Sequence, residues 1–436
     1  MTKPTGDLAI IGSGIAGLTA ANYSKNKNKL IFEKGSIGGK TRSETINNFT
    51  CDVGAQFLLN KFNFTLKLIE ELGLKRKLAE FNQPLISIYR DGQIIPIKPS
   101  ILGFIRSGPF NFSNKLNFLR MFRKIRDISA RYDLSFKRSG LGTRHDHISI
   151  SDWVLENFEE DLLEYFVQPL LTSITLSEPE ELSATYGLTL LSSMEHLYAI
   201  RGGFGEIPAR IIEKNSLESK IFSNAEVKKI VVENEKVAGV DVSIKGTKKF
   251  YPATKIICSV PSKTVLKILK LPVKNRRAFE QIEYSSAIQV CIATKERVWD
   301  KTYGIVIPRA EKKMISAIAE STLRNDSYAP KGNGLLSIFI AGKNAKKLLK
   351  KKDNVIGEKV IDELEDIFPG IEDKKIFIKT YKWEQGIPIH RPGFSEWVNY
   401  LGSPYKNLYF CGDYLYLGSV ESAVYSGVEA AKLSDT

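Results

Sequence analysis

The sequence has few of the residues that build metal centres and disulfide frameworks. Its 436 residues include four cysteines and four histidines, and no two cysteines have the CxxC spacing. Four scattered cysteines in a chain of this length do not form a disulfide framework, and the scattered histidines do not make a zinc site. We therefore expect no bound metal and an intracellular protein.

Long apolar runs are missing as well. No stretch reaches the roughly 18–20 apolar residues that are needed to cross a bilayer. Residues 1–7 are too few and too polar for a signal peptide. The sequence thus predicts a cytoplasmic protein, either soluble or bound peripherally on the inner face of the membrane.

Acidic residues are fewer than basic ones. The chain has 63 Lys and Arg against 49 Asp and Glu, a net charge of +14, and 43% of its residues are hydrophobic. That apolar fraction is enough for sizeable cores and excludes global disorder. The positive excess favours an anionic partner such as a membrane surface or an acidic ligand. No nucleic-acid-binding module is recognisable, so we do not expect nucleic acid as a partner.

The first forty residues have the order of elements expected around a dinucleotide. An apolar run at 7–11 predicts a buried parallel strand, residues 18–23 predict a helix, and 29–33 predict a second strand. The turn between the first strand and the helix comprises Gly12, Ser13, Gly14, Ile15, Ala16 and Gly17. This order predicts a bound dinucleotide, and by itself it does not choose between NAD and FAD.

Each glycine of this turn meets a separate requirement. Gly12 permits the tight bend, Gly14 lets the backbone approach a pyrophosphate, and Gly17 allows close packing of helix on strand. The helix N-terminus offers free N–H groups to the phosphates. Glu33 ends the second strand 21 residues after Gly12. Its carboxylate would accept hydrogen bonds from the ribose hydroxyls and repel the 2′-phosphate of NADP.

Two further segments resemble motifs of an FAD-dependent family, and this resemblance implies that the dinucleotide is FAD. The first comprises Glu33, Lys34, Gly38, Gly39, Lys40, Thr41 and Arg42, and the second comprises Gly54, Ala55, Gln56 and Phe57. They resemble the E-x(4)-GG-[RK] and D-x-G-[AP] motifs of the FAD-dependent superfamily that contains monoamine oxidases, protoporphyrinogen oxidases and carotenoid-type desaturases. The resemblance implies that the second glycine pair lies along the pyrophosphate and that residues 54–57 pass near the flavin ring.

The C-terminal end resembles the same family. An apolar strand at 408–411 leads into Gly412 and Asp413, and a predicted helix follows Ser419 and Val420. In the family this G-[DE] pair lies on the ribityl and phosphate side, and the helix N-terminus points at the N1–C2=O edge of the flavin. A helix N-terminus there would stabilise the negative charge of the reduced ring.

The middle of the chain completes the expected architecture. Residues 225–232 and 237–242 alternate like paired strands, and the resemblance implies that the backbone of Val227 meets the adenine. We predict an α/β fold in which an α+β substrate domain is inserted into a Rossmann-type FAD-binding domain of glutathione-reductase-like topology. The FAD-binding domain comprises residues 1–82, 196–270 and 378–436, and the substrate domain comprises residues 83–195 and 271–377.

Positive charge is concentrated in residues 98–144, which hold eleven basic and two acidic residues. Apolar side chains fall there at helical spacing, with arginines on the other face, at Phe118, Met121, Phe122, Ile125, Ile128 and Tyr132. A basic amphipathic helix can lie on an anionic membrane or clamp an acidic ligand. The alternative is a surface helix whose apolar face packs on its own lobe.

The positions that amine oxidases of this superfamily use carry other residues here. Motif spacing puts Gln289 at the position of the lysine near flavin N5, and puts Ile387 and Ser419 at the positions of two caging tyrosines. No cysteine for covalent attachment of FAD lies between Trp383 and Gly393. These absences argue against ordinary amine oxidation and for noncovalent FAD.

The expected chemistry is removal of a hydride from a large apolar molecule. Residues 176–184 and 201–208 resemble segments of protoporphyrinogen oxidases, and porphyrinogens and polyisoprenoids both fit as substrates. The propionate-binding arginine of plant-type enzymes would fall near Ile86, where Arg90 is the nearest cation. Transfer from an activated C–H needs an oriented donor carbon and an electron sink, and does not strictly need a side-chain base.

We therefore predict an FAD-dependent oxidoreductase of the oxidase or desaturase type, in which hydride passes to flavin N5 and oxygen or a quinone is the final acceptor. Catalytic residues stay unassigned, although His196 and His390 are candidate proton shuttles. One alternative is an atypical flavin amine oxidase. Another, of a different class, is a non-catalytic isoprenoid-binding escort-type protein that has lost its flavin.

Overall fold

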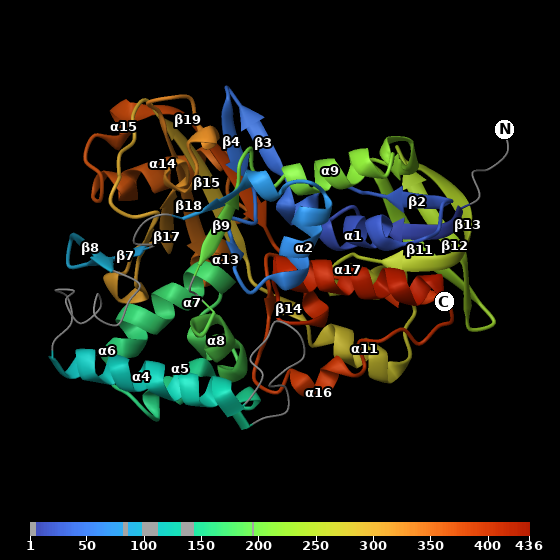
Figure 1. Ribbon diagram of the computed structural model, residues 1–436, viewed down its shortest axis with the longest axis horizontal. Coiled ribbons are helices and arrows are strands. Elements are labelled where there is room, and N and C mark those ends of the chain that lie inside the picture. Colours follow the sequence, from blue (N-terminus) through green and yellow to red (C-terminus); the bar gives the residue numbers. More distant parts are fainter. Residues whose placement is uncertain (1–5, 82–85, 98–111, 132–143, 194–195) are drawn as a thin grey trace.

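The computed structural model describes residues 6–81, 86–97, 112–131, 144–193 and 196–436. Two seven-stranded sheets organise the molecule, one on the side of the chain termini and one on the opposite side (Figure 1). The mixed α/β architecture with a Rossmann-type sheet confirms the predicted fold class.

The first sheet draws its strands from three separate parts of the chain. Its order is β10 (Ile221–Phe222), β2 (Lys29–Phe32), β1 (Gly6–Ile11), β13 (Thr247–Cys258), β12 (Lys236–Ile244) and β11 (Ala225–Glu233), with β21 (Leu408–Phe410) beside β13. β1 pairs in parallel with both β2 and β13, and β13 pairs in parallel with β21. Residues 8–11 are buried, as a short apolar run covered on both faces requires.

Two helices from opposite ends of the chain cover this sheet together. α1 (Ile15–Tyr23) and α17 (Val420–Asp435) lie side by side (Figure 1). A Cβ added to Gly427 of α17 would lie 2.5 Å from the Ala16 carbonyl oxygen of α1. Only glycine permits this approach, so the two ends of the chain are in direct contact.

The second sheet lies on the side of the molecule away from the chain termini, and its central strands are buried (Figure 1). Its order is β19 (Lys375–Trp383), β15 (Ala287–Thr294), β18 (Gly334–Ala341), β17 (Ala317–Glu320), β16 (Gly304–Val306), β7 (Ile86–Arg90) and β8 (Gln93–Ile97). β19 crosses the predicted boundary at residue 378 and pairs with β15 up to Trp383. Residues 378–383 therefore belong to this second sheet and not to the sheet of β1.

The predicted helix within residues 98–144 is α4 (Phe112–Arg131). Its apolar side chains are buried in the protein: Phe118, Met121, Ile125 and Ile128 are exposed by 8% or less. Of the two alternatives for this face, the structure thus shows packing on its own lobe. Residues 98–111 and 132–143, which include Tyr132, lie outside the described residues. Within the described part of the chain, no helix combines the length and the apolar character that a membrane crossing needs.

Smaller elements connect the two sheets. Three small sheets consist of β3 (Ser43–Ile46) with β4 (Phe49–Asp52), of β5 (Leu58–Leu59), β9 (Leu197–Ile200) and β6 (Leu78–Glu80), and of β14 (Glu283–Tyr284) with β20 (Pro388–Ile389). The other helices are α2 (Asn63–Glu71), α5 (Ile150–Leu155), α6 (Glu160–Leu162), α7 (Gln168–Thr175), α8 (Ala184–Leu191), α9 (Glu206–Lys214), α10 (Ser262–Ile268), α11 (Val273–Glu280), α12 (Ser321–Arg324), α13 (Gly342–Leu348), α14 (Asp353–Glu365), α15 (Ile371–Lys374) and α16 (Ser395–Val398). Gln289, near the start of β15, donates a hydrogen bond to the carbonyl of Asp52, the last residue of β4, so the residues that follow β4 lie beside the second large sheet.

Candidate functional site

The glycine turn after β1 is closed on one side and open on the other. Gly12 has a φ of 96°, and a Cβ added to Gly17 would lie 2.2 Å from the Gly12 carbonyl oxygen. A Cβ added to Gly14 would meet no protein atom within 4 Å. Packing therefore requires the first and third glycines, whereas the second faces open space at the start of α1. A pyrophosphate at a helix N-terminus would occupy such a space.

The residues expected around the adenosine lie together beside this turn. The Ser13 amide and hydroxyl both donate to Glu33 Oε2 at 2.8 Å. The Ala225 amide donates to the Glu33 carbonyl at 2.8 Å, which brings the first residues of β11, including Val227, next to the end of β2. Lys34 forms an ion pair with Glu226 at 3.0 Å.

The second glycine pair lies directly against the first turn. The Gly38 amide donates to the Ser13 carbonyl at 2.9 Å, and a Cβ added to Gly39 would lie 3.2 Å from Gly14 Cα. The hydroxyl of the buried Thr41 donates to the Gly38 carbonyl at 2.8 Å. The two glycine-rich segments therefore form one continuous backbone surface.

The remaining predicted segments close on the same place. Lys40 Nζ pairs with Asp413 Oδ2 at 2.8 Å, across 373 residues of sequence. The Ala55 amide donates to the Lys40 carbonyl at 2.9 Å, and a Cβ on Gly54 would lie 2.4 Å from that same oxygen. The guanidinium of Arg42 lies over the Trp383 ring at 5.7 Å.

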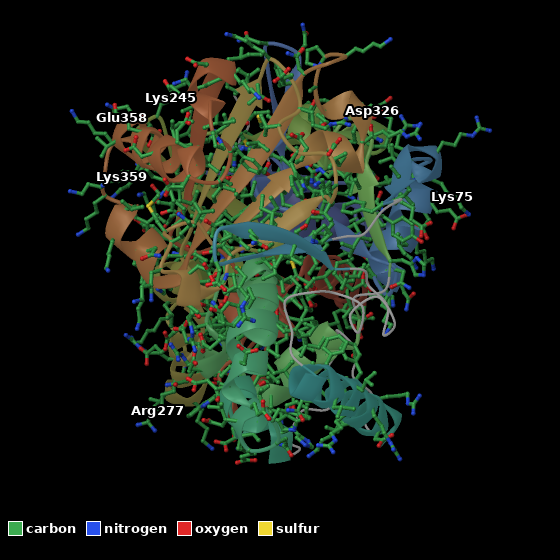
Figure 2. All side chains as sticks on the ribbon, turned by 90° about the vertical axis from the view of Figure 1, so that its left-hand side faces the viewer. Lys75, Lys245, Arg277, Asp326, Glu358 and Lys359 are labelled. Carbon is green, nitrogen blue, oxygen red and sulfur yellow. The ribbon has the colours of Figure 1, made fainter. Side chains whose placement is uncertain are left out.

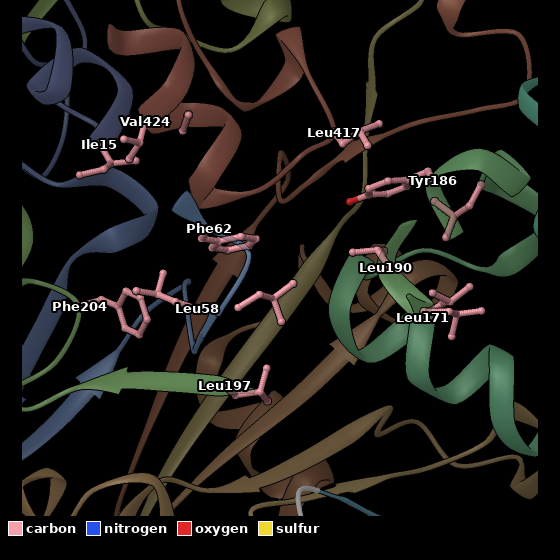
Figure 3. Packing of buried hydrophobic residues seen from close by; sticks show 14 of the residues in the cluster. Ile15, Leu58, Phe62, Leu171, Tyr186, Leu190, Leu197, Phe204, Leu417 and Val424 are labelled. Atoms are coloured by element: carbon pink, nitrogen blue, oxygen red, sulfur yellow. The ribbon is translucent and has the colours of Figure 1, made fainter. Parts of the chain in front are cut away.

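A cavity of about 1490 Å³ extends from these segments to α4. Residues 54–57 and 418–420 both line it. Its wall is mainly apolar, and Figure 3 shows three of the side chains that form it, Phe62, Leu190 and Leu197, each from a different part of the chain. The cavity is thus an apolar chamber whose wall includes the predicted flavin segments.

The charged residues of the cavity wall have one sign. The described residues that line it include no aspartate and no glutamate, and its formally charged side chains are Lys61, Arg123 and Arg126. His196 also lines the cavity, and its Nδ1 lies 2.7 Å from Glu80 Oε1 outside the lining. A positive ligand would therefore find no counter-charge in this part of the wall.

Two buried amides meet beside the end of the cavity formed by residues 54–57. Gln56 Nε2 donates to the Asp52 carbonyl at 3.0 Å, and Gln289 Nε2 donates to the same oxygen at 2.6 Å. Their side-chain carbonyl oxygens are buried and have no hydrogen-bond partner among the described residues. Buried polar atoms in folded proteins are nearly always paired. These two oxygens therefore fit a bound group that donates hydrogen bonds. The open space at Gly14 likewise leaves room for a bound group.

The amine-oxidase positions keep the character expected from the sequence. Gln289 is buried on β15, and both Ile387 and Ser419 line the cavity without an aromatic ring. Ile86 also lines the cavity, whereas Arg90 pairs with Asp161 at 3.3 Å. Arg90 is therefore committed to a partner on the protein.

Sequence reasoning missed a buried charge cluster behind the expected flavin segment. Arg324 Nη2 lies 3.1 Å from Asp52 Oδ2, and neither side chain is exposed. Arg324 Nη1 donates to the Gln56 carbonyl at 2.5 Å, and the Tyr328 hydroxyl donates to Asp52 Oδ2 at 2.7 Å. Burial raises the pKa of Tyr328 well above its usual value, which keeps the hydroxyl protonated. The cluster fixes the backbone of Gln56 from outside the cavity.

His390, a candidate proton shuttle, and Tyr186, which the sequence did not single out, together hold the loop before α17. The Gly418 amide donates to His390 Nε2 at 2.9 Å, and the Tyr186 hydroxyl donates to the Gly418 carbonyl at 3.1 Å. Burial lowers the pKa of His390 to about 3, so the imidazole is neutral and accepts this hydrogen bond. His390 does not line the cavity. Its position therefore suits orienting Gly418 and the N-terminus of α17 rather than moving protons.

Comparisons with known proteins agree with this geometry. A family model described as flavin containing amine oxidoreductase matches residues 15–433. Protoporphyrinogen oxidase 2, chloroplastic/mitochondrial, from Arabidopsis thaliana is 20% identical, with 98% of this chain and 93% of that protein covered. A 4,4′-diapolycopen-4-al dehydrogenase from Metabacillus indicus is 24% identical, with 87% and 82% covered.

A solved structure shows the same fold. Cyclohexylamine oxidase from Brevibacterium oxydans superposes with a TM-score of 0.78 over 99% of both chains, at 17% identity. The TM-score of 0.78 shows a common fold, and an identity of 17% leaves the substrate undetermined.

Proposed function

This chain belongs to the flavin containing amine oxidoreductase family, and from that premise we propose that it removes a hydride from an activated C–H bond of a large apolar substrate. Family membership makes it an FAD-dependent oxidoreductase. The observation that carries the finer proposal is the cavity of about 1490 Å³, which has an apolar wall and no carboxylate among its described lining residues.

We propose that the clustered glycine segments hold the FAD. The turn at 12–17 and the segment 38–42 would bind the pyrophosphate, Glu33 the ribose, and the backbone of Val227 the adenine. When bound, FAD supplies an acceptor for two electrons and a proton. Residues 54–57 and the start of α17 would flank the flavin ring, because both line the cavity. The partial positive charge of the α17 N-terminus favours negative charge at that place.

The cavity explains how the chain's own residues would promote such a reaction. Small-molecule pockets usually have about 300–1,000 Å³, so this volume has room for a large ligand beside part of the cofactor. Leucine, isoleucine and phenylalanine side chains exclude water and bury an apolar substrate. Holding one C–H bond against the acceptor removes much of the entropic part of the barrier. This requires no side-chain base, and none is assigned.

The lining argues against a cationic amine as the substrate. Lys61, Arg123 and Arg126 would repel a protonated amine, and the described lining offers no carboxylate to compensate. Motif spacing puts Gln289, Ile387 and Ser419 at the positions where amine oxidases of this superfamily carry a lysine and two tyrosines. We therefore keep the atypical amine oxidase as the alternative to be tested and not as a second proposal.

Anaerobic mixing of the FAD-loaded protein with three compounds tests the proposal. The compounds are a porphyrinogen, a colourless polyene precursor and benzylamine, and the measurement is bleaching of the flavin absorption band. We expect the porphyrinogen or the polyene precursor to bleach the flavin much faster than benzylamine. Fastest bleaching by benzylamine would establish amine oxidation instead, and a protein that takes up no FAD would support the escort-type alternative. Reoxidation with oxygen and with a quinone would then identify the electron acceptor.

A further inference from the structure

We propose that Arg123 and Arg126 of α4 bind an anionic group of the substrate at the mouth of the cavity. The substrate would then be a large apolar molecule with an acidic end. This assignment rests on the proposed function, because it concerns the ligand of the same cavity.

The position of α4 puts apolar and charged side chains along one wall. Phe118, Phe122 and Ile125 line the interior, and the Phe118 ring packs edge-on against the ring of Phe166, another lining residue, with centroids 4.8 Å apart. Arg123 and Arg126 line the same cavity and are exposed, so they stand where the chamber opens to solvent. Residues three apart are neighbours on a helix surface, so the two guanidinium groups can reach one ligand group together.

Both arginines are free to take a ligand. Neither has an ion-pair or hydrogen-bond partner within the described ranges. Other arginines close to the cavity are already engaged: Arg90 with Asp161, and the buried Arg324 with Asp52. An unpaired cation beside an apolar wall gains most from an anion, because the adjoining low dielectric strengthens the attraction.

A third basic residue adds positive charge to the cavity wall, and none of the described lining residues is acidic. Lys61 lines the cavity, and its Nζ donates to the Ser192 carbonyl at 2.8 Å, which leaves its charge without a carboxylate partner in the described chain. A mouth with one sign of charge focuses the field and draws in an oppositely charged ligand. The cavity therefore selects for a negative group outside and an apolar body inside.

The chemistry of the guanidinium group narrows the choice of anion. Its planar array of N–H donors matches the paired oxygens of a carboxylate or a phosphate. Two sources would supply such a group, an acidic side chain or terminus on the apolar body, or a diphosphate on a polyprenyl chain. Both share the recognition by Arg123 and Arg126, and the experiment separates them.

Fluorescence titration of the FAD-loaded protein with a polyene probe tests this site. The probe is cis-parinaric acid, and the comparison ligand is its methyl ester, which has the same apolar body and no charge. We expect the acid to bind at least about tenfold more tightly than the ester. Arg123→Gln and Arg126→Gln should each weaken binding of the acid about tenfold and leave binding of the ester unchanged.

Arg120→Gln is the matched control. Arg120 is exposed on the same helix and does not line the cavity, so this variant changes net charge equally and should bind the acid as the unaltered protein does. Displacement of the probe by farnesyl diphosphate and by farnesol separates the two sources of anion. Stronger displacement by farnesyl diphosphate than by farnesol identifies a phosphate ligand, and equal displacement by the two identifies a carboxylate.

Three results would overturn the assignment: equal affinity for the acid and the ester, equal weakening by Arg120→Gln, or no binding of either the acid or farnesyl diphosphate. The proposed function fails in a different way, because it fails if benzylamine bleaches the flavin fastest or if no apolar compound reduces the flavin. If a neutral polyene bleached the flavin while the two arginine variants behaved normally, the hydride chemistry would stand and the anion site would not.

Discussion

Gly14 is the one residue of the glycine turn whose side-chain position faces open space. Its φ of −67° suits alanine, and an added Cβ would meet no protein atom within 4 Å. We expect Gly14→Ala to change the free energy of unfolding of the FAD-free protein by less than about 1 kcal/mol. The new methyl group would take the space proposed for the pyrophosphate, so the affinity for FAD should fall at least about tenfold. Urea unfolding and flavin-fluorescence titration measure the two quantities.

Gly17→Ala provides the contrast, because its Cβ would lie 2.2 Å from a backbone oxygen. That variant should lose stability itself, by about 1–3 kcal/mol for overpacking. If Gly14→Ala bound FAD as tightly as the unaltered protein, the pyrophosphate would have to lie elsewhere.

His390 makes the stability of the protein depend on pH. Burial lowers its folded-state pKa from 6.5 to about 3. As the pH falls below 6.5, His390 is protonated in the unfolded chain but stays neutral in the folded protein. The free energy of unfolding therefore decreases between about pH 6.5 and pH 3. Linkage gives a loss of about 2 kcal/mol from this group between about pH 7 and pH 5.

Urea unfolding of the unaltered protein and of His390→Gln at about pH 7 and about pH 5 measures this loss of stability. The glutamine side chain can still accept the hydrogen bond from the Gly418 amide. Titration of the carboxylates contributes equally to both proteins, so the variant should lose about 2 kcal/mol less on acidification. Equal losses in the two proteins would mean that the imidazole is not shielded from protons.

At the scale of elements, the contact between α1 and α17 joins the two ends of the chain. A Cβ on Gly427 would lie 2.5 Å from the Ala16 carbonyl and 2.9 Å from Thr19 Cβ. We expect Gly427→Ala to push the helices apart and to lower the free energy of unfolding by about 1–3 kcal/mol. FAD affinity should fall with it, since both helix N-termini face the proposed cofactor site. Urea unfolding and FAD titration measure both effects.

Gly402→Ala is the control for this prediction, because an added Cβ there would meet no atom within 4 Å. It should leave both stability and FAD affinity close to those of the unaltered protein. If Gly427→Ala did the same, the helices would be less tightly coupled than their contact implies.

The elements that sequence could predict are those encoded by neighbouring residues. β1, the glycine turn and α1 follow one another within 23 residues, and each has its own local pattern. The helical period of α4 was equally readable, and its helix is confirmed. What its apolar face covers was not readable, because period alone does not distinguish a protein core from a lipid surface.

The parts that sequence could not predict depend on contacts between distant residues. Asp52 and Arg324 are 272 positions apart, and nothing local to either marks them as a pair. His390 was noticed as a histidine, but its hydrogen bond with Gly418 depends on the docking of β20 beside β14. The same holds at the predicted boundary at 378, because β19 runs across it and pairs with β15, and no local pattern marks that pairing.

At the scale of the whole molecule, the proposed site draws on segments from both ends and the middle of the chain. β1, β13 and β21 are neighbours in one sheet, although they lie up to 400 positions apart in the sequence. The cavity takes its walls from the second sheet and from the helical part around α4. Cofactor binding should therefore stabilise all of these parts together, since a ligand that binds only the folded state adds its free energy to folding.

The distribution of charge over the molecule determines how it would meet a membrane. The net charge is +14, and Lys75, Lys245, Arg277 and Lys359 point outward from different parts of the surface (Figure 2). The apolar face of α4, which could have contacted lipid under one of the two alternatives, is buried in the protein. We therefore expect any contact with the inner face of a membrane to be electrostatic.

Sedimentation with vesicles containing anionic phosphatidylserine tests this. The protein should sediment with them at about 0.1 M salt and be released at about 1 M, because the screening length falls from about 10 Å to about 3 Å. Vesicles of neutral phosphatidylcholine should not bind it at either salt concentration. Sedimentation that persisted at about 1 M salt would require insertion of apolar side chains, and would direct attention to residues 98–111 and 132–143, outside the described part of the chain.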